Sequence, residues 1–199
     1  MTRPLILASA SPRRRDLLER HGFAFEVRAA DVDETPPTGE APPRVAELLA
    51  LKKARAVAVG VERGTVIGAD TIVVGGEDVL LGKPEDADDA RRILASLSGT
   101  THRVITGVAV IHRPEDDEQV AHEVTYVTMR AMTADEIGDY VDSGESFGKA
   151  GAYAIQETGD RFVTKLEGDY ENVVGLPVGR LKSMLDADDR AIRTERSES

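Results

Sequence analysis

The sequence contains no cysteine, so it has no disulfide framework, no thiolate metal site and no cysteine nucleophile. It also lacks an apolar run long enough to span a bilayer, and no signal-peptide pattern stands at its start. We therefore expect a soluble, cytoplasmic protein with no membrane partner. Walker A, GxGxxG and Ser/His/Asp patterns are absent as well, and the four histidines do not have metal-ligand spacing.

Basic residues are in the minority, with 25 lysines and arginines against 36 acidic residues and a formal net charge of −11. Nucleic-acid binding depends on a basic face, so this balance argues against a nucleic-acid partner. Only six of the basic residues are lysines. An acidic, lysine-poor chain suits a salt-rich cytoplasm, and we hold this as a hypothesis.

Strand and helix patterns alternate along the 199 residues, which predicts an α/β fold. The chain shows no internal repeat and no separating linker, so we expect a single domain over residues 1–190, with two small lobes sharing a cleft, and a frayed tail over residues 191–199. The expected strands are residues 5–8, 23–27, 65–67, 71–74, 103–111 and 123–132, with one more after a glycine-rich loop at 144–159. The expected helices are residues 12–22, 43–60, 85–98, 134–143 and 175–189.

Two local signals refine this pattern. Gly75 and Gly76 predict a hairpin turn, and Thr133 with Glu136 three residues later forms the sequence pattern of a capping box.

The segment LILASASPRRR places a basic cluster at the start of a helix. Ser11 occupies the expected N-cap position and Pro12 the first helical position, so the arginines at 13–15 fall in the first turn. The helix dipole favours anions at that end, and clustered cations there make sense if a phosphate binds beside them. The alternative is a solvated basic turn.

Three other loops place a polar residue beside glycine. Asp70 interrupts an apolar β region, which requires a cation or a catalytic role unless the side chain caps a turn. Lys83 lies between Gly82 and Pro84, which suits phosphate binding, although an exposed lysine in a turn is also ordinary. In the fourth loop, GKAGAYAIQ, Lys149 precedes a short apolar run that ends at Gln156; the alternative is a core strand with Gln156 at its edge.

The predicted long helix adds Lys52 and Lys53, and we expect at least one of them near its buried edge. The preceding loop contains Asp31, Asp33 and Glu34, which could supply a carboxylate to a divalent cation or could simply be solvated. Together these residues indicate a phosphate-handling, hydrolytic site in which Asp70 takes a proton from the attacking water. They do not identify a substrate.

The motifs LASASPRR, KKARAVA, IGADTIV, GKP, LSGTTHRVITGVAV and GKAGAYAIQ…GDYENVVGLPV, with the Glu34 region, resemble those of the Maf family in order and spacing, from Leu5 to about Leu185. The resemblance implies a nucleotide diphosphatase, a nucleoside triphosphate pyrophosphatase that cleaves between the α and β phosphates. It also implies an inosine-triphosphatase-like (Maf/Ham1) fold, with a curved mixed β-sheet, flanking helices and two lobes around a cleft. A divalent metal, Mg²⁺ or Mn²⁺, and a homodimer are implied as well.

By similarity, Asp70 is the catalytic base, and Glu34 and Asp70 are the carboxylates on the metal side. The substrate-binding residues carried over from the family are Ser9, Ser11, Arg13, Arg14, Lys53, Thr71, Lys83, Lys149 and Gln156. Among these, Arg13, Thr71 and Gln156 match the specificity positions of the subgroup that acts on dTTP and UTP. A glutamine amide offers a donor and an acceptor to the edge of a uracil or thymine ring.

Alternatives remain open within and outside this enzyme class. The same reaction on 7-methyl-GTP or another nucleotide is one, and housecleaning of modified pyrimidine nucleotides is a related role. A nucleotide-binding regulator of cell division without turnover is another. Asp70, Lys53 and Lys83 favour the enzyme, because a pure binder has no need of a general base.

Overall fold

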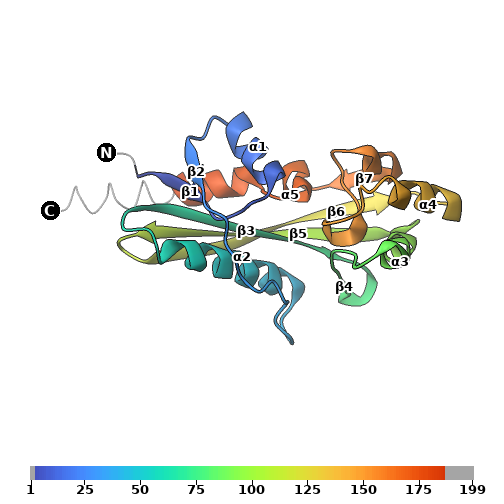
Figure 1. Ribbon diagram of the computed structural model, residues 1–199, viewed down its shortest axis with the longest axis horizontal. Coiled ribbons are helices and arrows are strands. Elements are labelled where there is room, and N and C mark those ends of the chain that lie inside the picture. The colour runs from blue at the N-terminus through green and yellow to red at the C-terminus, as the bar shows by residue number, and fades with distance from the viewer. Residues whose placement is uncertain (1–2, 187–199) are drawn as a thin grey trace.

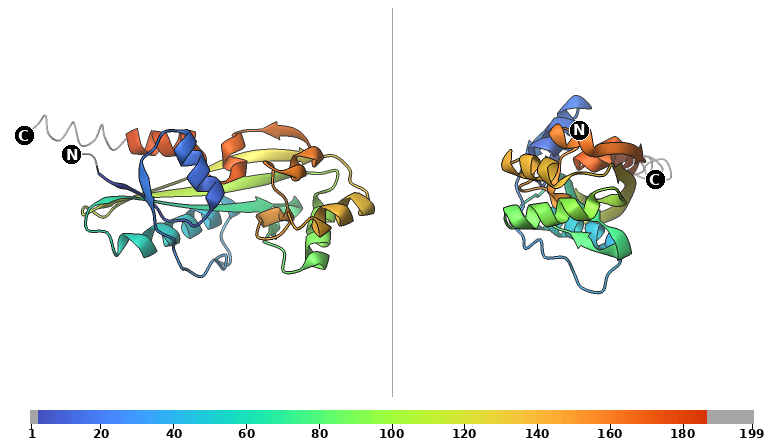
Figure 2. Two further views of the ribbon diagram at one scale, coloured as in Figure 1. Left: turned by 45° about the horizontal axis from the view of Figure 1, so that its top comes forward. Right: turned by 90° about the vertical axis from the view of Figure 1, so that its right-hand side faces the viewer.

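The computed structural model describes residues 3–186 of the chain. Three long antiparallel strands form its centre: β3 (Gly64–Val74), β5 (Thr101–Arg113) and β6 (Asp117–Met129). The molecule is elongated along these strands (Figure 1; Figure 2). They belong to a seven-stranded mixed sheet of order β2-β1-β3-β5-β6-β7, in which β4 also pairs with β3.

Shorter elements complete the fold. The other strands are β1 (Leu5–Leu7), β2 (Phe25–Val27), β4 (Leu80–Leu81) and β7 (Val163–Glu167). The α-helices are α1 (Pro12–Arg20), α2 (Pro42–Ala58), α3 (Ala87–Leu97), α4 (Ala134–Asp142) and α5 (Tyr170–Val174), and residues 178–186 are also helical. Three short 3₁₀ helices are η1 (Gly76–Asp78), η2 (Ala150–Ala152) and η3 (Thr158–Phe162).

Helix α2 covers one face of the sheet, and α1 and α5 lie on the opposite face (Figure 1). The backbone of α2 lies directly against β3 and β5, because each of these strands has a glycine where the helix contacts it. A Cβ added at Gly68 would lie 2.2 Å from the Ala50 carbonyl oxygen, and one at Gly107 would lie 2.2 Å from that of Ala46. Glycine at these positions therefore sets how closely α2 approaches β3 and β5.

One edge of β3 is only partly paired. On one side β5 pairs with the whole strand, whereas on the other side β1 pairs with residues 65–67 and β4 with residues 73–74. Within the described part of the chain no strand pairs with residues 68–72 along that second edge. This gap in the sheet edge lies between the two ends of the molecule.

The α/β prediction with a mixed sheet is confirmed, and so are the hairpin at Gly75 and the capping box of α4. The two strands expected on either side of Asp70 are wrong, because β3 runs without a break through that residue. Gly68 and Asp70 resemble a strand break in sequence, but Gly68 is the contact point for α2 and Asp70 has a partner on that helix.

Other boundaries also differ from expectation. The strands expected at 103–111 and 123–132 extend toward each other as β5 and β6, so that polar residues expected in the connection are paired, as in Ile111↔Glu118 and His112↔Asp117. Helix α2 begins at Pro42 rather than Pro43, and the short helix α5 was not expected.

The predicted tail at 191–199 lies outside the described residues, and the single domain over 1–190 stays a prediction. Among residues 3–186 we find no helix with the length and apolar character that a membrane crossing requires.

Candidate active site

A pocket of ≈ 390 Å³ lies at the unpaired stretch of β3. Its walls come from the loop after β1, the start of α1, the loop before α2, helix α2 itself, strands β3 and β5, the loop after β4, and residues within the segments 148–156 and 173–175. All residues predicted for the site line this one pocket: Ser9, Ser11, Arg13, Arg14, Glu34, Lys53, Asp70, Thr71, Lys83, Lys149 and Gln156. Their individual roles stay predictions, but the fold brings them together from distant parts of the chain.

Asp70 faces α2, because side chains alternate along a strand and Gly68 two residues earlier contacts that helix. It is 8% exposed, and its Oδ1 accepts a hydrogen bond from Lys53 Nζ at 2.5 Å. Lys53 Nζ also lies 2.7 Å from Glu34 Oε1, and Lys83 Nζ donates to Glu34 Oε2 at 2.8 Å. Two carboxylates and two ammonium groups thus alternate across the pocket. Lys53 is buried and Lys52 is exposed, which confirms the expectation that at least one of these lysines lies near the buried edge of the long helix.

The charge on Glu34 is stabilised by these lysines. Burial raises the pKa of the Glu34 carboxyl, but hydrogen bonds from Lys53 and Lys83 outweigh burial and lower that pKa to about 2. Glu34 is consequently an anion at neutral pH. Its contact with Lys83 joins the loop before α2 to the loop after β4 in the wall of the pocket.

Thr71 points to the opposite face of the sheet and meets Arg14 there. The Arg14 guanidinium donates from Nε to the Gly175 carbonyl at 2.8 Å, and its two terminal nitrogens donate to Ser9 Oγ at 3.1 Å and to Thr71 Oγ1 at 3.2 Å. Thr71 Oγ1 also lies 2.9 Å from Thr106 Oγ1 on β5. These contacts fix the position of the predicted specificity residue Thr71.

Burial lowers the pKa of the Arg14 guanidinium, the nearby Asp70 carboxylate opposes this shift, and Arg13 adds to it. Arginine nevertheless keeps its charge in proteins, so Arg14 is a buried cation in the pocket wall. The predicted phosphate ligand Arg14 is therefore engaged mainly with protein groups, whereas Arg13 is only half-buried.

The start of α1 differs in detail from expectation. Ser11 occupies the N-cap position and Pro12 the first turn, but the Ser11 side chain makes no capping hydrogen bond. Instead, the Ser11 backbone N–H donates to Ser9 Oγ at 3.2 Å. Ser9 thus accepts from both Ser11 and Arg14 and orders the turn between β1 and α1.

The glycine-rich segment that contains Lys149 is closed on itself. Lys149 Nζ donates to the Glu145 carbonyl at 2.5 Å and to Glu157 Oε2 at 3.0 Å. The Glu145 carboxylate accepts from both the backbone and the hydroxyl of Thr158. Gln156 is exposed at the pocket in this loop and does not end a core strand, which settles the alternative against the strand.

Glu34 and Asp70 fit the predicted role of metal ligands in their chemistry. Magnesium is usually held by one or two carboxylates together with substrate phosphates. Both carboxylates contact the same ammonium group, that of Lys53, so they converge on one point. Within residues 3–186 there is no group of three or more His, Cys, Asp or Glu side chains that could hold a metal ion by itself.

Sequence analysis missed several residues that line the pocket or hold residues that do. The Gly175 carbonyl holds Arg14, and Glu157 holds Lys149. Tyr153 lines the pocket and its hydroxyl lies 2.8 Å from His102 Nε2, where burial lowers the pKa of His102 to about 4 and keeps it neutral. Glycine beside a polar motif was the one available signal for Gly175; the other contacts join residues too far apart in sequence to leave a local pattern.

Comparison with known proteins shows the family to which the chain belongs. The sequence profile of the Maf-like protein family matches residues 4–187. A protein of Pelotomaculum thermopropionicum named dTTP/UTP pyrophosphatase is 51% identical over 181 residues, which cover 91% of this chain and 94% of that protein. One of Moorella thermoacetica with the same name is 50% identical over 181 residues, covering 91% and 93%.

Among solved structures, the Ham1 protein of Staphylococcus aureus superposes with a TM-score of 0.52, covering 93% of this chain and 99% of its own. Its sequence identity is 15%, so the likeness concerns the fold alone, and it confirms the expected Ham1-like fold. The profile match over nearly the whole chain and the relatives at about half identity show that this chain belongs to the Maf-like protein family.

Proposed function

We propose that the protein hydrolyses dTTP and UTP between the α and β phosphates, releasing dTMP or UMP and pyrophosphate. The observation that supports this most is the buried contact between Asp70 and Lys53 at the unpaired edge of β3, inside a pocket with further cations. The relatives at about half identity bear the name dTTP/UTP pyrophosphatase. That name and the pocket agree on the class of substrate.

In this proposal Asp70 accepts the proton of the attacking water. Lys53 donates a hydrogen bond to its Oδ1, which leaves the second carboxylate oxygen for that water. Lys83, Lys149 and Arg13 neutralise the triphosphate and stabilise the charge that develops on the leaving pyrophosphate. The triphosphate would replace Glu34 on Lys83 and Glu157 on Lys149, which would leave Glu34 free to act as a metal ligand.

A divalent cation, Mg²⁺ or Mn²⁺, belongs to the proposal and would be held by Glu34 and Asp70. When bound, it supplies Lewis-acid polarisation and neutralises phosphate charge. A homodimer in the cytoplasm is also part of the proposal, as is the absence of nucleic-acid and membrane partners.

Base selection would depend on Arg13, Thr71 and Gln156. The exposed Gln156 amide can pair with the O4 and N3–H edge of uracil or thymine. Thr71 cannot move to admit a larger base without losing its contacts with Arg14 and Thr106. Gln156 and Thr71 therefore favour a pyrimidine over 7-methyl-GTP.

The test is product analysis with dTTP, UTP, CTP, GTP and 7-methyl-GTP in Mg²⁺ or Mn²⁺, at low and at molar KCl. We expect pyrophosphate from dTTP and UTP only. Replacing the general base in Asp70→Asn should lower kcat by about 10²- to 10⁴-fold. Asp117→Asn, at an exposed position of β6, is the matched control and should keep full activity.

Other products would contradict the proposal in distinct ways. Orthophosphate would mean that a different bond is cut. Turnover of 7-methyl-GTP alone would contradict the roles of Thr71 and Gln156. Nucleotide binding without turnover at any salt concentration would favour the regulator of cell division.

A further inference from the structure

Phe147 lies in the closed segment described above, next in sequence to residues of the pocket wall. Its two following residues, Gly148 and Lys149, line the pocket, and Gly148 has a φ of +71° that turns the chain there. The preceding residue, Ser146, is completely buried, so it anchors the segment in the body of the molecule. Phe147 itself is 43% exposed.

The other phenylalanines of the chain belong to the core. Phe162 is fully buried, and Phe23 and Phe25 pack against the main hydrophobic cluster. Phe147 is part of none of the hydrophobic clusters of residues 3–186, and no aromatic or cation–π contact involves its ring there. A single exposed apolar side chain is common on protein surfaces, so the location of Phe147, rather than its exposure, is informative.

Phe147 belongs to the same closed segment as Gln156, the predicted base-reading residue. The contact between Lys149 and Glu157 and the contact between Glu145 and Thr158 hold the two arms of the segment together. In sequence, Phe147 lies between Glu145 and Lys149, and Gln156 directly precedes Glu157 and Thr158. Phe147 and Gln156 therefore lie on the two paired arms of one segment.

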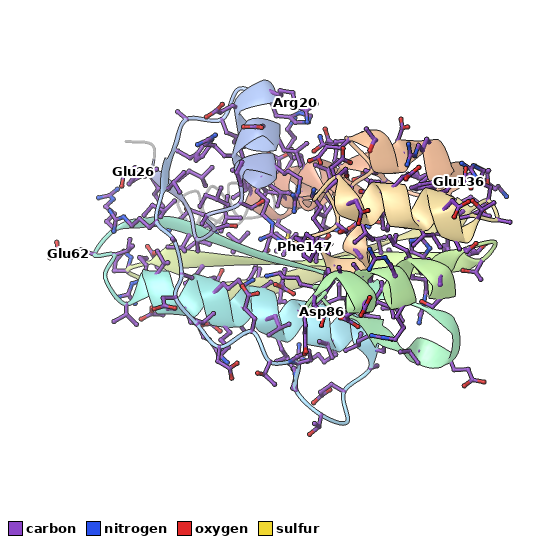
Figure 3. All side chains as sticks on the ribbon, turned by 45° about the vertical axis from the view of Figure 1, so that its right-hand side comes forward. Arg20, Glu26, Glu62, Asp86, Glu136 and Phe147 are labelled. Carbon is purple, nitrogen blue, oxygen red and sulfur yellow. The ribbon has the colours of Figure 1, made fainter. Side chains whose placement is uncertain are left out.

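Figure 3 shows where Phe147 lies relative to α1 and α3. Helix α1 descends from Arg20 toward the middle of the view, and Asp86 marks the start of α3 below it. Phe147 is labelled between them. The start of α1 and the Lys83 loop, three residues before Asp86, both belong to the pocket wall.

We propose that Phe147 binds the pyrimidine ring of the substrate by stacking against its face while Gln156 reads its edge. Stacking on an aromatic side chain needs an accessible ring at the base end of the pocket, and every base offers a π-face to it. Gln156 then supplies the selectivity that stacking lacks. This inference rests on the proposed function, because it assumes a nucleotide in this pocket.

The chain contains no tryptophan, which provides a direct test. In Phe147→Trp the new indole is the single tryptophan, and we expect its fluorescence to be quenched when UMP or dTMP is added. Pyrophosphate has no base and should leave the signal unchanged. Tyr126→Trp, at a 48% exposed site on β6 away from the pocket, is the control and should respond to neither ligand. An indole at 147 that ignores UMP, while calorimetry shows UMP bound, overturns the proposal.

Kinetics give a second, independent measurement. Phe147→Ala should raise KM for UTP roughly tenfold through the loss of one base–aromatic stack, with kcat little changed. Inhibition by pyrophosphate should keep its wild-type constant. An unchanged KM overturns the proposal, and so does an equal loss of UTP and pyrophosphate affinity, since that result means the whole segment has moved. If the wild-type protein releases no pyrophosphate from UTP, the proposed function fails instead, and the fluorescence test with UMP still decides whether Phe147 contacts a base.

Discussion

Arg14 shows how a charged side chain can be part of the framework of a binding site. Removing a cation from water costs several kcal/mol unless hydrogen bonds replace its hydration. Here three acceptors, on Ser9, Thr71 and Gly175, surround the guanidinium. They come from the loop after β1, from β3 and from the end of α5, so Arg14 joins three separate parts of the pocket wall.

We therefore predict that Arg14→Lys lowers the free energy of unfolding of the ligand-free protein by about 2 kcal/mol, the range for hydrogen bonds to a charged group. Lysine keeps the charge but cannot reproduce the planar fork of donors. Urea unfolding measures the change, and Arg15→Lys is the matched control, because the Arg15 side chain is 52% exposed. Equal stability of the two variants would mean that Arg14 acts only as a phosphate ligand.

Helix α2 determines the geometry around Asp70. Lys53 precedes Ala54, whose backbone nitrogen would lie 2.8 Å from a Cβ at Gly68. The close approach of the helix at this point brings Lys53 Nζ within hydrogen-bond distance of Asp70, two residues along β3 from Gly68. A helix held further from the sheet would separate the ammonium from the carboxylate.

Gly68→Ala should consequently lower the free energy of unfolding by about 3 kcal/mol, because the added methyl group meets backbone rather than a flexible side chain. It should also lower kcat by displacing Lys53. Gly138→Ala in α4 is the matched control: nothing lies within 4 Å of the new Cβ, so replacing a helical glycine should stabilise the protein by about 0.5–1 kcal/mol. Thermal and urea unfolding of both variants would check the pair, and a neutral Gly68→Ala would contradict the close approach.

Elements with a strong local signal could be predicted from the sequence. The capping box at Thr133 and Glu136 and the acidic first turn of α3 both mark true helix starts. The continuity of β3 through Asp70 could not be predicted, since an acid between a glycine and a threonine has the local chemistry of a turn. What makes it compatible with a strand is Lys53, which the sequence alone does not place.

The same distinction applies to the site. Motif resemblance identified residues that the fold gathers in one pocket, because each motif keeps its chemistry within a few neighbouring residues. The pairings among them, such as Arg14 with Gly175 or Lys149 with Glu157, depend on the folding of distant segments and on loop closure. The exposure of the Phe147 ring likewise depends on the folded structure and cannot be predicted from the local sequence.

Charge is unevenly distributed over the whole molecule. Three of the six lysines, together with two arginines, line the pocket against two carboxylates, although the chain has a net charge of −11. The rest of the molecule therefore carries more negative charge than the net charge of the chain alone indicates. Repulsion among these charges opposes the compact state and is screened by salt.

We predict that the free energy of unfolding increases from low to molar KCl. Screening also weakens surface ion pairs such as Arg55–Glu118, but exposed pairs contribute little individually, so the relief of net repulsion should dominate. Urea titrations at several KCl concentrations measure this effect. Stability that is flat or declines with KCl would remove the hypothesis of adaptation to a salt-rich cytoplasm.

The three long strands have a mechanical consequence for catalysis. β3, β5 and β6 are continuous strands of 11, 13 and 13 residues, and residues of β3 and β5 line the pocket, so this part of its wall belongs to one paired sheet. Rotation of one half against the other would require bending a paired three-stranded beam, because hinges need a few loop or terminal residues to absorb the change. Any movement that accompanies ligand binding is therefore expected in the loops that contribute to the pocket wall, at 28–41 and 144–162, while the strand residues of the wall keep their spacing.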